Sequence, residues 1–152
     1  MQPKRRPDSQ DMSAGTETGI LERCNAIEEC YEFMLAYAAK GLPREEVGAA
    51  GSPIRQFLDR AASAISGLAE SYALTLREGR FESAEKYKAF LAVLDRDAQN
   101  SLAAIELVRA QPSISSQLVD NLNASIHLRA LLTDLFLVGD VVRSQLTGKT
   151  NR

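Results

Sequence analysis

The chain has 152 residues, a formal net charge of -2, and 45% hydrophobic and 25% charged residues. These values are typical of one globular domain, and folding at this size removes roughly 70% of the unfolded chain's surface from water. The small net charge excludes a general attraction to phosphate backbones or anionic lipid. We therefore expect neither nucleic acid nor a membrane as a partner.

Residues 1–18 have no apolar periodicity, and we expect them to form a disordered N-terminal tail. The basic cluster at 4–6 is not followed by an apolar stretch, so the pattern is not that of a secretory signal. Cys24 and Cys30 lie six residues apart in the first predicted helix and so point to different sides of it. Two reduced cysteines are typical of the cytoplasm, which is the location we expect.

Apolar residues at alternating steps of four and three predict a first helix from about Thr18 to Lys40. They form two neighbouring stripes, Ile20, Cys24, Ile27, Tyr31, Met34 and Ala38 in the first and Ala26, Cys30, Phe33 and Tyr37 in the second. Two stripes imply two packing partners. Gly41, followed by Leu42 and Pro43, ends the helix with the chemistry of a left-handed C-terminal cap.

The same alternation predicts a second helix that begins after Ser52, with Pro53 in its first turn, and continues to Gly79. A third helix is expected from about Phe81 to Ala110. Because the turn between them is very short, the second and third helices should be antiparallel neighbours.

Pro112 ends the third helix, and a fourth is expected from Ile114 to about Leu146. Together the segments predict an all-α fold: an antiparallel up-and-down four-helix bundle over residues 19–147, roughly 40 Å long, with a short polar tail at 148–152. The connection 41–51 exceeds the usual length of about 2 to 8 residues, so it either carries its own turn or has a function.

The fourth predicted helix is apolar on nearly every side, most clearly at Leu135, Phe136, Leu137 and Val138. Successive helical residues are about 100° apart, so one face of a bundle cannot cover all four. We expect these residues to form an interface, most simply against the same helix of a second subunit, so that the protein is a homo-oligomer or binds another protein.

A membrane span is not expected from this helix. Such a span needs about 20 nearly uncharged residues, and Arg129, Asp134 and Asp140 interrupt the apolar stretch. Arg129 and Asp134 lie among apolar neighbours, where a buried ion pair or a hydrogen bond across an interface would satisfy them.

The sequence offers no standard metal, cofactor or catalytic motif. His127 is the sole histidine, and Ala124 three residues before it excludes the Glu-x-x-His pair of di-iron bundles. Asp120 and Asp134 each lie seven residues from His127, about 10 Å along a helix, which is too far for three ligands on one ion. We expect no metal, no cofactor and no assignable catalytic residue.

Two weaker patterns point to small ligands. Tyr31, Tyr72, His127 and Arg129 could line an interior pocket between helices. The other pattern is a candidate anion site, in which glycine amides and a helix N-terminus combine with basic side chains; it consists of Arg44, Gly51, Ser52 and Arg55. Glu45 and Glu46 oppose an anion there and favour an ordinary loop that ends in a capped helix.

Two functions therefore stay open. The first is a non-enzymatic helical bundle that acts through protein–protein contacts, as a homodimer or an accessory subunit. The alternative is a small-ligand-binding or catalytic bundle with an interior pocket near His127 and Arg129. The native mass and the absorbance of the purified protein would distinguish them, since they would show a dimer, a partner, a metal or a chromophore.

Overall fold

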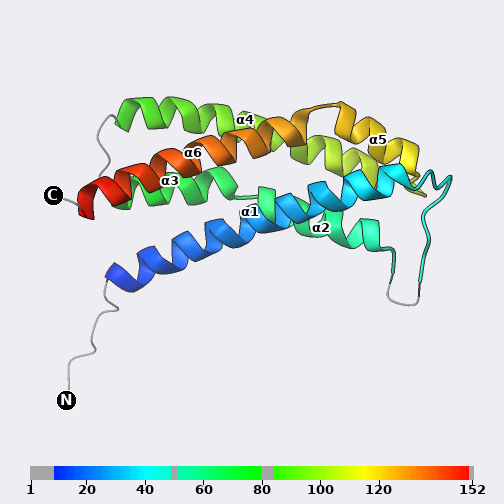
Figure 1. Ribbon diagram of the computed structural model, residues 1–152, viewed down its shortest axis with the longest axis horizontal. Coiled ribbons are helices and arrows are strands. Elements are labelled where there is room, and N and C mark those ends of the chain that lie inside the picture. Colours follow the sequence, from blue (N-terminus) through cyan, green and yellow to red (C-terminus); the bar gives the residue numbers. More distant parts are fainter. Residues whose placement is uncertain (1–8, 49–50, 80–83, 151–152) are drawn as a thin grey trace, which may run out of the picture.

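The computed structural model describes residues 9–48, 51–79 and 84–150, and within these ranges the chain forms helices and no β-strand (Figure 1). This confirms the all-α expectation for the described residues. The helices are α1 (Ser9–Ala39), α2 (Pro53–Ile65), α3 (Leu68–Gly79), α4 (Ala84–Arg109), α5 (Ser116–Ala124) and α6 (His127–Thr150). No helix in the described ranges is long and apolar enough to cross a lipid bilayer.

The expected helix over 52–79 is broken into α2 and α3, so the prediction of one continuous helix there is wrong. Gly67 adopts a φ of +83°, a left-handed conformation that glycine tolerates and that ends a right-handed helix. The guanidinium group of Arg23 in α1 satisfies carbonyl oxygens that the end of α2 leaves unpaired. It donates at 3.2, 3.0 and 2.7 Å to the carbonyl oxygens of Ser63, Ala64 and Ser66.

The expected helix over 114–146 is also broken, into α5 and α6. Ser115 caps α5, with its hydroxyl oxygen accepting a hydrogen bond from the Leu118 amide at 3.1 Å. Ile126 separates the two helices with a φ of +63°, a conformation that is strained for a β-branched residue. Four uninterrupted helices are therefore not present, because two of the four are divided.

The ends of the helices also differ from those expected. α1 begins at Ser9 rather than at about Thr18, so the backbone of residues 9–18 is helical, while residues 1–8 of the predicted tail lie outside the described residues. The predicted start of the third helix at Phe81 also lies outside them. α6 continues to Thr150, into the predicted polar tail.

The core lies between α1 and α4, each of which contacts α2, α3, α5 and α6 (Figure 1). The first predicted stripe on α1 supplies Ile20, Ile27 and Met34 to this core, and the second supplies Cys30 and Tyr37. Burial of large apolar side chains contributes about 1.5 to 3 kcal/mol each, so these two stripes hold α1 in place.

Hydrogen bonds tie the end of α1 to the start of α5. The Tyr37 hydroxyl donates to the Ile114 carbonyl oxygen at 2.6 Å, and the Ser116 hydroxyl donates to the Tyr37 carbonyl oxygen at 2.7 Å. The Leu42 amide donates to the Ser116 hydroxyl oxygen at 2.8 Å, and the Ser116 amide donates to the Leu42 carbonyl oxygen at 2.9 Å. This network fixes the direction in which the chain leaves α1.

Candidate functional site

The apolar run of α6 divides between the core and the surface. Leu135 and Val138 are buried against their own chain and are therefore not free to meet a partner, whereas Phe136 and Leu137 are 54% and 53% exposed. Val141, one turn after Leu137, is also exposed. We call Phe136, Leu137 and Val141 the exposed α6 face. That this face is an interface stays a prediction. Of the four residues predicted for it, Phe136 and Leu137 are exposed and could take part.

A groove of about 380 Å³ runs beside this face, between α1 and α6. It is lined mainly by apolar atoms, from Ile20, Leu21, Cys24, Asn25 and Glu28 of α1, Tyr72 and Thr75 of α3, and Leu135, Phe136, Gly139, Val142 and Arg143 of α6. Gly139 helps to keep the groove open because it has no side chain. We call this the α1–α6 groove.

Burial keeps the thiol and the phenol of the groove in their neutral forms. The Cys24 thiol lies 3.9 Å from the Tyr72 hydroxyl, and burial, together with the nearby Glu28 carboxylate, raises the pKa of Cys24. Burial, reinforced by Cys24, likewise raises the pKa of Tyr72. Burial also raises the pKa of Cys30, in the core, to about 12. Because the thiolate is the nucleophilic form, neither cysteine has the character of a catalytic nucleophile.

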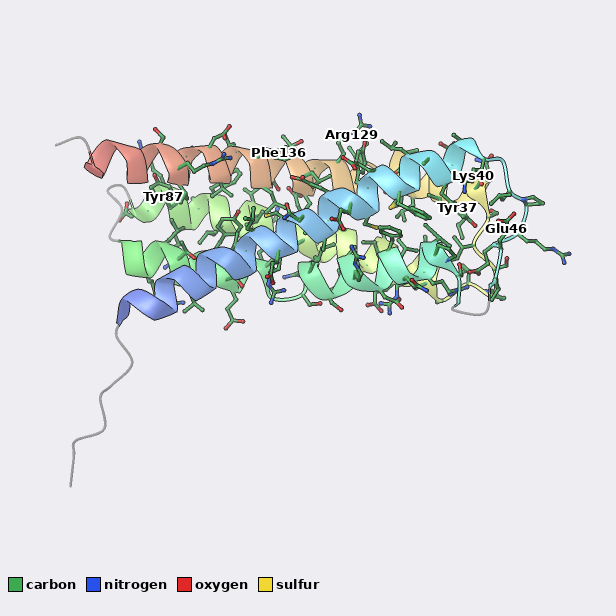
Figure 2. The ribbon with its side chains drawn as sticks, turned by 60° about the horizontal axis from the view of Figure 1, so that its bottom comes forward. Tyr37, Lys40, Glu46, Tyr87, Arg129 and Phe136 are labelled. Atoms are coloured by element: carbon green, nitrogen blue, oxygen red, sulfur yellow. The ribbon has the colours of Figure 1, made fainter. Side chains whose placement is uncertain are left out.

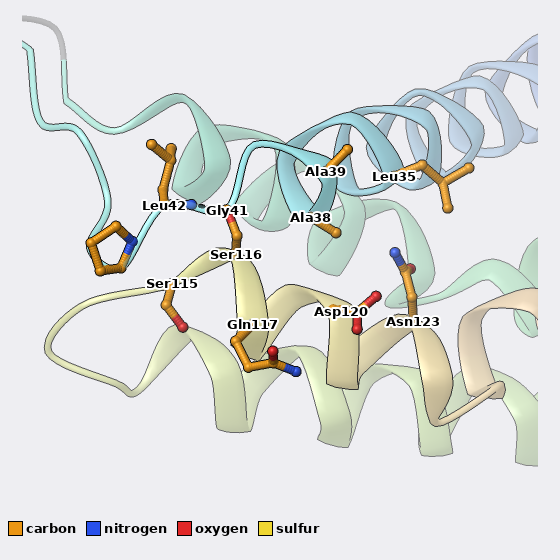
Figure 3. A pocket seen from close by; sticks show the side chains of 11 residues that line it. Leu35, Ala38, Ala39, Gly41, Leu42, Ser115, Ser116, Gln117, Asp120 and Asn123 are labelled. Carbon is orange, nitrogen blue, oxygen red and sulfur yellow. Dashed lines mark hydrogen bonds between the residues drawn. The ribbon is translucent and has the colours of Figure 1, made fainter.

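A second cavity, of about 690 Å³, lies between the end of α1 and α5 (Figure 3). The hydrogen bond from Leu42 to Ser116 crosses it, and Leu35 on its α1 wall is 48% exposed. One stripe of α1, with alternating steps of four and three, includes residues that border the α1–α6 groove (Leu21, Asn25, Glu28) and residues that border this cavity (Leu35, Ala39), with Glu32 between the two hollows and bordering neither. We call it the α1 stripe: Leu21, Asn25, Glu28, Glu32, Leu35 and Ala39. The two hollows therefore follow one seam.

A third cavity, of about 600 Å³, lies between the end of α1 and the connection to α2. Tyr37, Lys40 and Glu46 border it and lie at the same end of the molecule (Figure 2). Burial, helped by nearby glutamates, raises the pKa of Tyr37, whose hydroxyl is already bonded to a carbonyl oxygen. The Tyr37 hydroxyl at this cavity is therefore engaged in a contact with the segment before α5.

The four residues of the candidate anion site do not converge. Gly51 and Ser52 border the third cavity, whereas Arg44 is exposed and does not border it. The Arg55 guanidinium is already paired with Glu45, with contacts of 2.7 to 3.1 Å. Arg55 also donates to the carbonyl oxygens of Arg109 and Gln111 at 2.8 and 2.7 Å. An anion would have to compete with all these acceptors.

The Glu45 carboxylate is the acidic counterpart in this network, and its side chain is only 5% exposed. It accepts a hydrogen bond from the Ile114 amide at 3.0 Å as well as those from Arg55. Burial acts to raise the pKa of Glu45, but these hydrogen bonds outweigh burial and lower it. The sequence showed this residue as an opponent of anion binding but not as an anchor of the connection.

The four residues of the candidate small-molecule pocket are also dispersed. Tyr72 lines the α1–α6 groove, and Tyr31 packs against the core from the middle of α1. His127 is the first residue of α6, and Arg129 is exposed along the same helix (Figure 2). Of these four, only Tyr72 lines any of the three cavities described above.

Asp134 meets an acidic partner that the sequence did not reveal. One of its carboxylate oxygens is buried without a hydrogen-bond partner in the described structure. Burial, and then the neighbouring carboxyl group of Asp97 in α4, raise the pKa of Asp134 to about 7. Asp134 stands out in the sequence because its neighbours are apolar, but Asp97, which lies between Arg96 and Ala98, gives no sign that the two residues meet.

Within the described residues, no three His, Cys, Asp or Glu side chains lie close enough together to hold a metal ion. Comparison with protein-family models, with curated proteins and with solved structures finds no match to this chain.

Proposed function

We propose that this protein is a non-enzymatic helical module that acts through protein–protein contacts, as a homodimer or as an accessory subunit. The observation that carries the proposal is the exposure of Phe136 and Leu137, two large apolar side chains at adjacent positions of α6. Large apolar side chains grouped on a surface mark sites of association. The neighbouring α1–α6 groove extends the apolar surface.

The energetics support the same proposal. Removing apolar surface from water contributes about 25 cal/mol per Å², so covering two half-exposed side chains and a groove favours association. Phe136 and Leu137 project about 100° apart around α6, which makes the exposed face too wide for one neighbouring helix of the same chain. A partner is the simplest cover for it.

We also propose that the helices are arranged as an antiparallel bundle of four rods, in which α2 with α3 and α5 with α6 each act as one broken rod. The pattern of neighbours supports this, since α1 and α4 both contact all of the broken segments. A rigid bundle of this kind would present α6 as a fixed surface.

The cytoplasm is the location we propose for this module. Cys24 and Cys30 are both free, and Cys30 is buried. Free cysteines persist where the thiol pool is reduced.

The exposed α6 face is tested by introducing a charge at each of its two largest residues. Phe136→Glu and Leu137→Glu should each weaken self-association by about 3 kcal/mol, because the new carboxylate would be desolvated without a partner. Light scattering coupled to size-exclusion chromatography measures the mass, and far-ultraviolet circular dichroism checks that the variants stay helical.

Leu74→Glu is the matched control, since Leu74 is a comparably exposed leucine on α3. It should leave the mass unchanged. If the unmodified protein is monomeric at micromolar concentration and captures no second protein through α6, the proposed function is wrong.

A further inference from the structure

We propose that the partner of the exposed α6 face is a second copy of this chain, and that the two copies meet along the α1–α6 groove with α6 of one copy against α1 of the other. This inference rests on the proposed function, because it names the partner of the same surface. It differs from pairing α6 with α6, the simplest expectation from the sequence. Three features carry it: the charges that flank the groove, the symmetry of a dimer, and the register of the two helices.

Side chains of opposite charge lie along α1 and α6 at the groove and beyond its end: Glu28 lines the groove, whereas Glu32 and Arg129 lie past it. Glu28 and Glu32 lie on the α1 stripe, and Arg129 lies on α6 seven residues before Phe136, on the same side of that helix (Figure 2). Among the described residues, none of these three has an ion-pair partner. Arg143, further along α6, is bonded to Asp140 at 3.2 Å. Thus the α1 side carries two carboxylates without an ion pair, and the α6 side carries one such cation, Arg129, just beyond the groove.

The two-fold symmetry of a dimer, taken together with these charges, selects one orientation of the two copies. Two identical copies that meet face to face are related by a two-fold axis in the plane of contact. An axis parallel to the groove places α6 opposite the second copy's α1, so that Arg129 faces the acidic side of α1. An axis across the groove places α1 against α1 and brings like charges together. Electrostatic complementarity selects the first arrangement.

The register agrees with this orientation. α1 and α6 run in opposite directions past each other, with residues 20–28 of one and 135–143 of the other lining the same groove (Figure 1). Extending both helices beyond the groove brings Glu32 and Arg129 to within about one turn, roughly 5 Å, of the same level. An axis parallel to the groove keeps each residue at its level, so Glu32 of one copy meets Arg129 of the other.

Apolar contacts reinforce the same placement. In this arrangement the half-exposed Phe136 of each copy points toward the α1–α6 groove of the other, where Leu21 is 61% exposed. The α1 stripe continues the seam to Leu35 and the second cavity. From Leu21 to Ala39 the seam is about 27 Å long at 1.5 Å per residue, the length of five turns of helix.

Charge exchange between copies tests this inference. Glu32→Arg and Arg129→Glu each place two like-charge contacts in the proposed dimer, so each variant alone should dimerise about tenfold more weakly than the unmodified chain. An equimolar mixture of the two variants restores both attractive contacts and should dimerise as tightly as the unmodified chain. The double variant E32R/R129E should also dimerise normally by itself. Analytical ultracentrifugation with one variant labelled measures each affinity.

Glu70→Arg and Arg96→Glu provide the matched control, since both residues are exposed and lie on α3 and α4. Mixing these two variants should change nothing. Circular dichroism confirms that all the variants remain helical.

The outcomes separate the inference from the proposed function. If the unmodified chain dimerises but the mixture of Glu32→Arg and Arg129→Glu does not recover, the inference is overturned while the proposed function stands. Preferential pairing of Glu32→Arg with the unmodified chain would overturn it in the same way, because that result requires α1 to lie against α1. A monomeric unmodified chain would overturn the inference and leave only the accessory-subunit form of the proposed function.

Discussion

Arg55 joins three segments that are distant in the sequence. Its guanidinium group binds the Glu45 carboxylate in the first connection and the carbonyl oxygens of Arg109, the last residue of α4, and of Gln111. A cation at a helix C-terminus is also favoured by the negative end of the helix dipole. The connection after α1 is therefore held at Glu45 by a polar anchor.

Removing this anchor should be costly. Arg55→Ala leaves the Glu45 carboxylate buried without its cation, and we expect the free energy of unfolding to fall by about 3 kcal/mol. Urea denaturation followed by circular dichroism measures the change. Arg60→Ala is the matched control: Arg60 pairs with Glu29 at an exposed site, and loss of such a pair costs about 0 to 1 kcal/mol. Equal losses for the two variants would show that Arg55 is not an anchor.

The Asp134 and Asp97 contact predicts a dependence of stability on pH. The pKa of Asp134 is raised from 3.8 to about 7 in the folded protein, so the folded state binds a proton that the unfolded state has already lost. Stability from this group is complete below pH 4 and is lost as the pH rises toward 7. Asp134→Asn should flatten the dependence of the thermal midpoint on pH in this window.

Asp120→Asn, at an exposed position of α5, is the control and should leave the pH dependence unchanged. Persistence of the full slope in Asp134→Asn would contradict a raised pKa at that carboxyl group. The sequence marks Asp134 as unusual, but it suggests Arg129 as the partner. The contact with Asp97 depends on the rotation of α4 against α6, which no residue pattern specifies.

Among the elements, the break at Ile126 has the clearest energetic consequence. A positive φ costs a non-glycine residue about 1 to 2 kcal/mol, and this isoleucine is exposed, so it recovers little by packing. Ile126→Gly should therefore raise the free energy of unfolding by about 1 kcal/mol, measured by urea denaturation. Ile126→Ala keeps the strained conformation and should gain much less. A loss of stability in the glycine variant would show that Ile126 is not strained.

The helices were predictable to the extent that apolar periodicity decides them. The alternation on α1 and α4 marks their buried sides correctly, for example at Ile27 and Leu94. The break at Gly67 was not evident because buried Leu68 and Tyr72 continue the stripe beyond it. Ile126 gives no local signal, since isoleucine is among the residues least expected at a positive φ.

For the whole molecule, the sequence indicates that α6 has more apolar surface than one core can cover, but it does not indicate the shape of that surface. The adjacency of Phe136 and Leu137 requires that at least one of them leave a narrow core seam, and both are exposed. The α1–α6 groove is different, because it depends on how far α1 and α6 stand apart above α3. That separation arises from the packing of helices that are distant in the chain.

Most hydrogen bonds between distant segments lie at the end of the molecule formed by residues 37–45 and 109–116, and the bonds from Arg23 to the end of α2 are the main exception. Native proteins open in cooperative units, starting where such ties are weakest, so opening should begin toward the opposite end, where the groove lies. A second copy would then bind the part of the protein that unfolds first. Dimerisation would therefore be coupled to the folding of this end of the molecule. Loss of the partner would shorten the lifetime of the chain in the presence of proteases.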